Sequence, residues 1–557
     1  MTRPNTPENA GVLTPDENAY SSDRSQDEYN KAEIERLGRQ RPEILSSAIV
    51  EFGFVTAIIM SMMMGEFFVS GFNIVLPTVG DSLNIPEPSR TWPAEVPSLT
   101  TAALLLPCAR LSDRYGGRIV FLAGVSWLVV WSLVCGFSQN TNMLIVCRAM
   151  QGLSTAAFLP AGISLLGQSY RPGPRKNFIF ALYGAFAVLG FYIGIAIGAL
   201  TAQLADWRWY FWVGAILAFA NAVIGFLTIP KDLGQDGDAA LAMDWWGLCT
   251  IVPGLVLVIF AFTDGGSAPQ GWRTPYVYIT LIIGVVFLAA AVYVEGWVAA
   301  QPLFPAEVFR PKGMKRLVVS LFCCYGVFGL YLFYVSYYLS TVLHTTPLQT
   351  AAWFTPMALG GIFLALMGGL VLHLIPGRIL MIISGLGFLL SVLLFALIPD
   401  QVDGAPSTGF LYWAYVFPAM LCSTIGVDIT YNVTNVFITT SMPARLQATA
   451  GALINSLLYL GIAFWLGVAE LAVSQTKETR ESGENEDELT PREQYKIAFW
   501  LAVGLAAVSL ILFSTLKIGQ ASADMTADEK AQLAAELAER ERARVRALEA
   551  DEERVEK

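Results

Sequence analysis

Charged residues, histidine and paired cysteines are all scarce in this chain of 557 residues. Only 14% of the residues are charged, against about 25% in an ordinary soluble domain. The only histidines are His344 and His373, and the seven cysteines show no paired spacing. These absences argue against a zinc site, a disulfide framework and a membrane enzyme built on histidines. No Gly-x-x-x-x-Gly-Lys-Ser/Thr loop occurs either, so we expect no built-in ATPase, no cofactor and no enzymatic activity.

Apolar sequence is what the chain has in abundance. The residues are 55% hydrophobic, and the mean hydropathy is +0.53. Runs of about 20 apolar residues, the length that crosses a bilayer, alternate with short polar connectors. Most runs are apolar all round, so they must be surrounded by lipid or by each other. This pattern predicts an all-α integral membrane protein with about fourteen transmembrane helices, of which 96–112 and 410–440 are the weakest predictions.

Charge sets the expected orientation and the division of the chain. Lys and Arg concentrate in connectors that lie inside if both termini are cytoplasmic. The net charge of −10 and the lack of a basic stripe exclude a nucleic-acid partner. We expect a disordered cytoplasmic tail at 1–45, a six-helix bundle at 46–230, two additional transmembrane helices at 231–300, a second six-helix bundle at 301–516 with an extracytoplasmic loop at 473–496, and a charged cytoplasmic tail at 517–557.

The segment Ala109-Arg-Leu-Ser-Asp-Arg-Tyr-Gly-Gly-Arg118 stands between the second and third predicted spans. It resembles the loop signature of the major facilitator superfamily, Gly-x-Leu-x-Asp-Arg-x-Gly-Arg-Lys. The resemblance implies the major facilitator fold, with two six-helix bundles plus two additional central helices, and a cytoplasmic latch. Charge that only orients the chain would explain the arginines but not the spacing of the Asp and the Gly. The latch residues are Asp113, Arg114, Gly116 and Arg118.

The fourth predicted span carries Arg148 and then Gln151-Gly152, which resembles the family's fourth-helix motif. An arginine inside a span is costly, so it normally faces a cavity or a partner. The resemblance implies that Arg148 takes part in proton coupling or gating and that Gln151 lines the cavity. The alternative is that Arg148 lies near the start of its helix and extends its side chain to the membrane surface.

Three glycines lie four residues apart on one face of the fifth predicted span: Gly190, Gly194 and Gly198. This spacing lets another helix approach closely, which predicts a packing face. The segment resembles the antiporter motif Gly-x-x-x-Gly-Pro-x-x-Gly-Gly, although Ile195 replaces the Pro and Ala199 the last Gly. The lost Pro weakens the inference of antiport.

Glu66 is the candidate proton carrier of the first span. Fourteen-span drug:proton antiporters often have Leu-Asp-x-Thr-Val-x-Asn-Val-Ala-Leu-Pro there, and this chain keeps Asn73, a cavity candidate, but has Phe68 at the Asp position. Glu66 lies two residues earlier. Buried carboxyl groups suit proton transfer, but two residues correspond to about 200° around a helix, so Glu66 also has the alternative of facing elsewhere.

Asp428 is the corresponding acid of the second half, in its most polar span. Asn432 and Asn435 follow at four and seven residues, so all three share one helix face, which we expect to line a cavity. Asp428 is therefore a second candidate for proton coupling or gating. Tyr334 belongs to a tyrosine-rich ninth span and is a further cavity candidate, although some of these tyrosines suit the membrane interface.

Three further motifs are Asp206-Trp-Arg-Trp-Tyr-Phe-Trp212, Val130-Trp-Ser-Leu-Val-Cys-Gly136 and Arg175-Lys-Asn177. With them, residues 50–515 look most like the aminotriazole-resistance and boron-efflux group of fungal fourteen-span transporters. This implies proton-coupled efflux of a drug, toxin or secondary metabolite by alternating access, with the proton gradient as the energy source. The alternatives are proton-coupled uptake of ammonium, an amino acid or a siderophore, and a non-transporting sensor. The expected partners are a small-molecule substrate, protons and the lipid bilayer, for a monomer in the plasma membrane rather than the vacuolar membrane.

Overall fold

The computed structural model describes residues 40–86, 89–170, 174–231, 242–266, 268, 270–371, 375–399, 408–442, 444–481, 489–516 and 518. The tails predicted at 1–45 and 517–557 therefore lie mainly outside the described residues. Within these ranges the chain is helical, with no strand.

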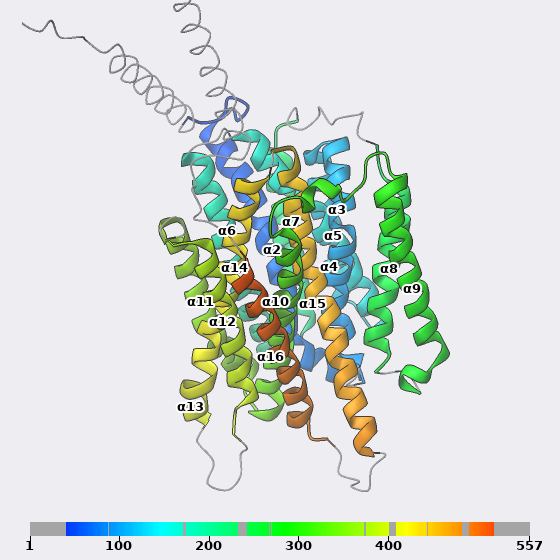
Figure 1. Ribbon diagram of the computed structural model, residues 1–557. Coiled ribbons are helices and arrows are strands. Elements are labelled where there is room, and N and C mark those ends of the chain that lie inside the picture. The colour runs from blue at the N-terminus through cyan, green and yellow to red at the C-terminus, as the bar shows by residue number, and fades with distance from the viewer. Residues whose placement is uncertain are drawn as a thin grey trace, which may run out of the picture.

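The helices follow one another with short connections (Figure 1). The first group is α2 (Ala48–Ser82), α3 (Thr91–Tyr115), α4 (Gly117–Cys135), α5 (Thr141–Ser169), α6 (Pro174–Leu204) and α7 (Arg208–Thr228). A pair follows, α8 (Trp245–Asp264) and α9 (Pro275–Tyr293). The last group is α10 (Met314–Tyr337), α11 (Pro347–Val371), α12 (Gly377–Ala396), α13 (Thr408–Leu411), α14 (Phe417–Ser441), α15 (Ala444–Glu481) and α16 (Pro491–Thr515).

Thirteen of the described helical segments are long and apolar enough to cross a membrane. The short helix α13, a π-helical turn at Tyr412–Val416 and α14 form one of these segments. Helix α3 is not among the thirteen, because its polar residues lower its hydropathy, yet its 25 residues pack inside the bundle against α5 and α15. The prediction of an all-helical membrane protein with about fourteen spans is confirmed.

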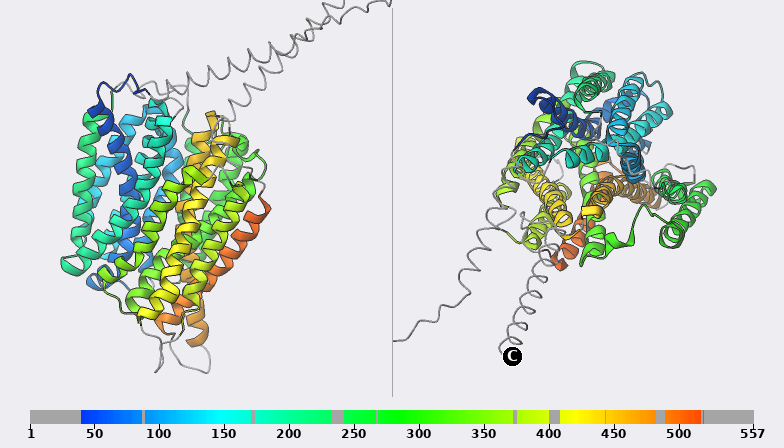
Figure 2. Two further views of the ribbon diagram at one scale, coloured as in Figure 1. Left: turned by 90° about the vertical axis from the view of Figure 1, so that its left-hand side faces the viewer. Right: turned by 90° about the horizontal axis from the view of Figure 1, so that it is seen from above.

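The helices associate in two groups and a peripheral pair. Helices α2–α7 pack mainly on one another, and α10–α16 do the same. The groups meet through α3 against α15 and α6 against α11. Helices α8 and α9 pack together at the edge of the bundle, where α8 also contacts α15 and α3 (Figure 2).

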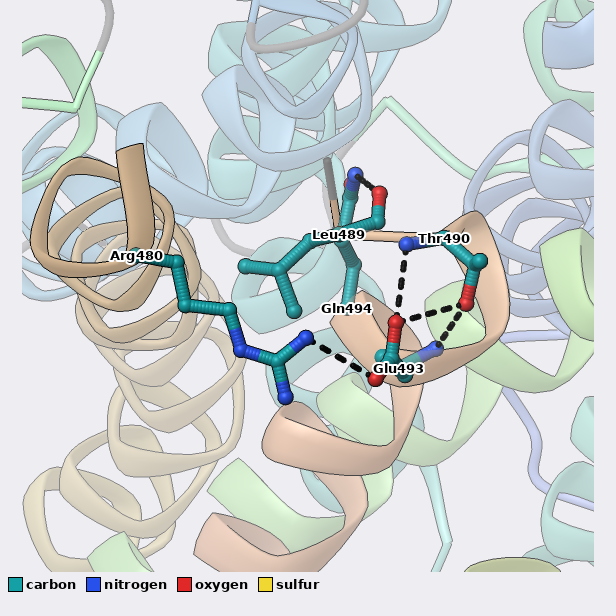
Figure 3. A network of polar contacts seen from close by, with 5 residues as sticks. All are labelled: Arg480, Leu489, Thr490, Glu493 and Gln494. Atoms are coloured by element: carbon teal, nitrogen blue, oxygen red, sulfur yellow. Dashed lines mark hydrogen bonds and ion pairs between the residues drawn. The ribbon is translucent and has the colours of Figure 1, made fainter. Parts of the chain in front are cut away.

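Local signals fix several helix ends. Ser47 and Asn140 cap α2 and α5 by accepting the backbone N–H groups of Val50 and Met143, as expected for N-cap residues. At the start of α16, Thr490 and Glu493 form a capping box (Figure 3). Glu493 also forms an ion pair with Arg480 of α15, at a distance of 3.0 Å. This network ties α15 to α16 across residues 482–488.

Two boundaries differ from those predicted. Helix α3 starts at Thr91, five residues before the predicted span 96–112, because a polar first turn hides a helix start from hydropathy alone. Within the predicted loop 473–496, α15 continues to Glu481 and α16 already begins at Pro491. Polar residues in this segment extend the helices instead of ending them.

Candidate functional site

Helices α2 and α6 approach each other closely, and the three predicted glycines of α6 all face α2. A Cβ atom added to Gly190 would lie 2.5 Å from the carbonyl oxygen of Met63, and one added to Gly194 would lie 2.5 Å from that of Phe67. Gly198 approaches Gly71 in the same way. Ser70 donates a 2.7 Å hydrogen bond to the Phe191 carbonyl across the same contact. This packing fixes the rotation of α2 about its axis.

Replacing Gly194 with Val is expected to lower stability by about 1–3 kcal/mol, because the added side chain meets backbone that cannot move aside. The measurement is the thermal unfolding midpoint of the purified protein in detergent. Gly184 lies on the same helix and has open space around it. Gly184→Val is therefore the matched control, and an equal loss in both variants would contradict the packing argument.

Glu66 of α2 and Asp428 of α14 come from different helix groups. Both side chains are partly exposed, and their carboxyl groups lie close enough to interact electrostatically. Among the described residues, no side chain donates a hydrogen bond to the Glu66 carboxyl. The orientation in which Glu66 faces away from the second half is therefore not the one observed. These two acids form the centre of the candidate site.

Tyrosines of α6, α14 and α15 lie within electrostatic range of Glu66. Tyr183 of α6, Tyr431 of α14 and Tyr459 of α15 all interact electrostatically with its carboxyl group. Tyr183 and Tyr459 are almost fully buried. The sequence analysis did not single out these residues, because isolated tyrosines inside apolar runs carry no local signal of the direction in which they point.

Asp428 is held by its own helix and covered by α11. Thr424 donates a 2.6 Å hydrogen bond to Asp428 Oδ2, and a Cβ on Gly361 would lie 3.0 Å from the same oxygen. Asn432 and Asn435 are partly exposed on this face and donate to backbone carbonyls one turn earlier. The side chain of Asn435 is also hydrogen-bonded to Tyr431. Among the described residues no group donates to the side-chain oxygen of Asn432, so this oxygen can accept a hydrogen bond from a ligand.

Asn73 lies seven residues after Glu66, on the same face of α2, and is almost fully buried. Its amide donates a 2.9 Å hydrogen bond to the Val69 carbonyl.

Tyr334 does not join the Glu66 tyrosines. It interacts instead with Glu95 and Glu470, two acids at the α3–α15 contact that the sequence analysis missed. Glu95 precedes the predicted start of its span, and Glu470 lies two residues from the predicted end of another.

Arg148 is fully buried, so its side chain does not extend to the membrane surface. Its Nε donates a 3.1 Å hydrogen bond to the Pro93 carbonyl of α3, and its Nη1 donates a 3.0 Å hydrogen bond to the Gln151 side-chain oxygen. The Gln151 amide in turn donates a 2.9 Å hydrogen bond to the Ser132 hydroxyl of α4. The guanidinium also lies 4.1 Å from the ring centroid of Phe72. Among the described residues no carboxylate pairs with Arg148, and its Nη2 lacks a hydrogen bond.

The predicted latch residues lie at the α3–α4 connection. Asp113 is exposed and interacts electrostatically with Arg110. Arg110 donates a 3.0 Å hydrogen bond to the side-chain oxygen of Gln301, which follows α9 in the sequence. Gly116 has φ +93°, a backbone conformation that favours glycine. Arg114 lies over the Tyr115 ring. Arg118 donates a 3.3 Å hydrogen bond to the Phe226 carbonyl of α7.

The described polar contacts between the two groups lie midway along the helices and at the end remote from Ala48. Tyr192 of α6 and Thr355 of α11 form a 2.7 Å hydrogen bond. Nearer the end remote from Ala48, the Leu348 backbone N–H donates a 3.0 Å hydrogen bond to the Gln203 side-chain oxygen. Arg90 interacts electrostatically with Tyr337 at the same end. At the Ala48 end, Glu51 is bonded within the first group, to Arg175 at 2.6 Å and to Tyr170 at 2.9 Å.

Comparisons with known proteins identify the family of the chain. The family profile described as Major Facilitator Superfamily matches residues 55–466. The chain is 30% identical over 524 residues to the "Low affinity ammonium transporter" of Saccharomyces cerevisiae, covering 92% of this chain and 95% of that protein. It is 29% identical to "Efflux pump terJ" of Aspergillus terreus, covering 86% and 89%, and 26% identical to "Aminotriazole resistance protein" of S. cerevisiae, covering 85% and 85%.

Solved structures show the same fold at lower identity. A crystal structure of peptide transporter POT in complex with sulfate matches with a TM-score of 0.59 and 15% identity, covering 86% of this chain and 97% of that chain. The human organic anion transporter MFSD10 (TETRAN) matches with a TM-score of 0.53 and 14% identity, covering 83% and 99%.

Proposed function

Because the chain belongs to the major facilitator superfamily of secondary transporters, we propose that it exports a small molecule in exchange for protons bound between Glu66 and Asp428. The family places it among integral, multi-pass membrane proteins that transport a small-molecule substrate, not among enzymes. The observation that carries the proposal is the approach of these two acids from opposite helix groups.

The chemistry of the pair suits coupling. Two carboxylates that interact repel each other, so binding of a proton there is favourable. A substrate that carries positive charge relieves the same repulsion and competes with the proton. Proton and substrate then occupy the site in turn, which is the requirement for exchange. One charge crossing 100 mV supplies about 2.3 kcal/mol, which drives export without nucleotide hydrolysis.

The site favours a cation or a weak base as substrate. Two acids and three tyrosines surround it, and tyrosine rings attract cations through their π-electrons. Arg148, the buried cation of the same half, is bonded to Pro93 and Gln151 instead. Drugs, toxins and secondary metabolites with a protonated amine or heterocycle meet this requirement.

The arrangement of contacts supports alternating access. The halves are joined midway and at the end remote from Ala48. With both termini cytoplasmic, as the distribution of basic residues predicts, that end faces outward and the site opens inward. Opening then requires the two helix groups to rock about the site. We place the protein, as a monomer, in the plasma membrane, where export removes the substrate from the cell.

The names of the relatives suggest a second candidate function. The named fungal relatives include efflux and resistance proteins, which support export and the aminotriazole-resistance-like group. One relative that aligns along 92% of the chain is named for ammonium transport. Ammonium is itself a cation, so uptake of ammonium through the same acidic site is the second candidate function.

A tolerance profile tests direction and substrate class together. A host lacking its own exporters would carry the wild type or Arg148→Ala, with equal membrane levels, and grow across azoles, aminotriazole, borate and ammonium analogues. We expect tolerance to a basic compound to rise only with the wild type. Sensitivity gained only with the wild type would overturn export in favour of uptake. Identical growth throughout would contradict transport of all these compounds.

A further inference from the structure

Gly361 of α11 lies where the two helix groups meet beside Asp428. Helix α11 packs against α6 of the first group and against α14 of its own group, and Gly361 is buried. A Cβ added to Gly361 would lie 2.7 Å from Val188 Cγ1 of α6, 3.0 Å from Asp428 Oδ2 and 3.1 Å from Thr424 Oγ1 of α14. Atoms of both helix groups therefore converge on one small space, which exists because residue 361 has no side chain.

The contact between α6 and α11 extends from this space toward the end remote from Ala48. Tyr192 of α6 and Thr355 of α11 form a 2.7 Å hydrogen bond, and the Leu348 backbone N–H donates a 3.0 Å hydrogen bond to Gln203. Along this series the residue numbers rise in α6 and fall in α11, so the two helices are antiparallel. Residue 361 therefore lies at the inner end of the polar contacts described between these helices.

The side chains around this space have little freedom to move aside. Valine is β-branched and strongly prefers one rotamer in a helix, so Val188 shifts mainly together with α6. The Asp428 carboxyl is held by the 2.6 Å hydrogen bond that Thr424 donates to Oδ2. On its other face, α6 approaches the α2 backbone closely at Gly190 and Gly194. Movement of the Asp428 carboxyl therefore acts on α6 as a whole and not on one side chain.

We propose that Gly361 is a positioning residue through which the Asp428 carboxyl sets how closely α6 and α11 meet. Because the Val188 methyl group and the carboxyl oxygen share one space, neither can change place without affecting the other. A proton or cation that draws the carboxyl away from Thr424 changes the room left for Val188, and the contact between the halves responds. The inference rests on the proposed function for the ligand of Asp428, whereas the steric contact itself does not depend on transport.

Thiol labelling of the purified full-length protein in detergent measures closure of this contact without transport. Ala351 is 5% exposed and lies between Leu348 and Thr355 on the face of α11 that contacts α6, so Ala351→Cys becomes reactive when the two helices separate. Each rate is corrected for labelling of the native cysteines. Gly361→Ala should raise the rate by about fivefold or more, because the added methyl group meets Val188 and favours separated helices. An unchanged rate would overturn the proposal.

Rescue and a matched clash distinguish this contact from ordinary overpacking. Val188→Ala removes the carbon nearest to the added methyl group, so Gly361→Ala combined with Val188→Ala should label at the rate of Val188→Ala alone. Gly385→Ala is the matched control, because its Cβ would lie 2.9 Å from Leu510 Cδ1 of α16, within the second helix group. This control should leave the rate unchanged. Failure of the rescue, or equal acceleration by Gly385→Ala, would contradict the proposal.

A further comparison tests the link to Asp428. Asp428→Asn removes the charge but keeps the shape, whereas Asp428→Ala also removes the oxygen that lies 3.0 Å from the added methyl group. The acceleration caused by Gly361→Ala should therefore be smaller in the Asp428→Ala background than in the Asp428→Asn background. Equal acceleration would mean that Gly361 only packs against α6, and the proposed link to the acid would be wrong.

Val188→Ile keeps the test open should Gly361→Ala fail to fold. It places an extra methyl group in the same space from the side of α6, so labelling of Ala351→Cys should again accelerate, and less in Asp428→Ala than in Asp428→Asn. No acceleration by Val188→Ile would count against the proposal. If the chain exports none of the tested compounds but these rates change as expected, the proposed function fails and the steric link stands.

Discussion

Glu66→Gln is expected to abolish proton-driven transport while leaving exchange of substrate for substrate intact. Glutamine keeps the shape and polarity of the side chain but cannot take up or release a proton. Losing one coupled proton removes about 2.3 kcal/mol per 100 mV, which lowers the maximum substrate gradient by roughly fiftyfold. The measurement is accumulation of a labelled basic substrate in proteoliposomes with an imposed proton gradient, compared with counterflow in the absence of one.

Asp428→Asn tests whether the two acids act together. If they share the coupled proton, this variant and the double variant should match Glu66→Gln, because the second loss adds nothing once the first is made. Asp206→Asn, an exposed carboxylate that binds Arg208, is the matched control and should keep wild-type accumulation. Wild-type gradients in both Glu66→Gln and Asp428→Asn would overturn the coupling assignment, even if the protein transports.

The number and type of spans were predictable because they depend on local properties. Length and hydropathy decide whether a segment crosses the bilayer, and neither requires knowledge of the neighbours. Helix α3 shows the limit of this rule. It carries Glu95 and a charged last turn, and the burial of Glu95 depends on α15 and α8, which are far away in the sequence. Hydropathy therefore missed its first turn and, with it, Glu95.

The site was predictable only as a set of residue types. Glu66 was a reasonable candidate because a carboxylate in an apolar run needs a reason to be there. Its direction depends on the rotation of α2, which the backbone contacts with Gly190 and Gly194 determine. The tyrosines that approach Glu66 come from α6, α14 and α15, and no spacing within one helix brings them together. Tyr334 was assigned to the same cavity but lies beside the other acid pair.

Arg148→Met is expected to stop transport without destabilising the protein. Arg148 is fully buried and has no carboxylate partner among the described residues, so its charge opposes folding. Methionine fills similar volume without that cost, and the unfolding midpoint should stay level or rise. The hydrogen bond to the Pro93 carbonyl, which connects α5 to α3, disappears, and so does the bond to Gln151 within α5. If these bonds to a charged group set the gating equilibrium, each is worth about 1.5–3 kcal/mol, or at least tenfold in rate.

Arg148→Lys separates charge from geometry. Lysine keeps the positive charge near Phe72 but lacks the planar fork that reaches Pro93 and Gln151 together. Partial transport would show that charge in this position matters most, whereas complete loss would assign the role to the bridge between α5 and α3. A large fall in the unfolding midpoint of Arg148→Met, with transport lost only in proportion to folded protein, would instead make Arg148 a structural residue. This set of variants therefore separates a role of Arg148 in gating from a role in folding.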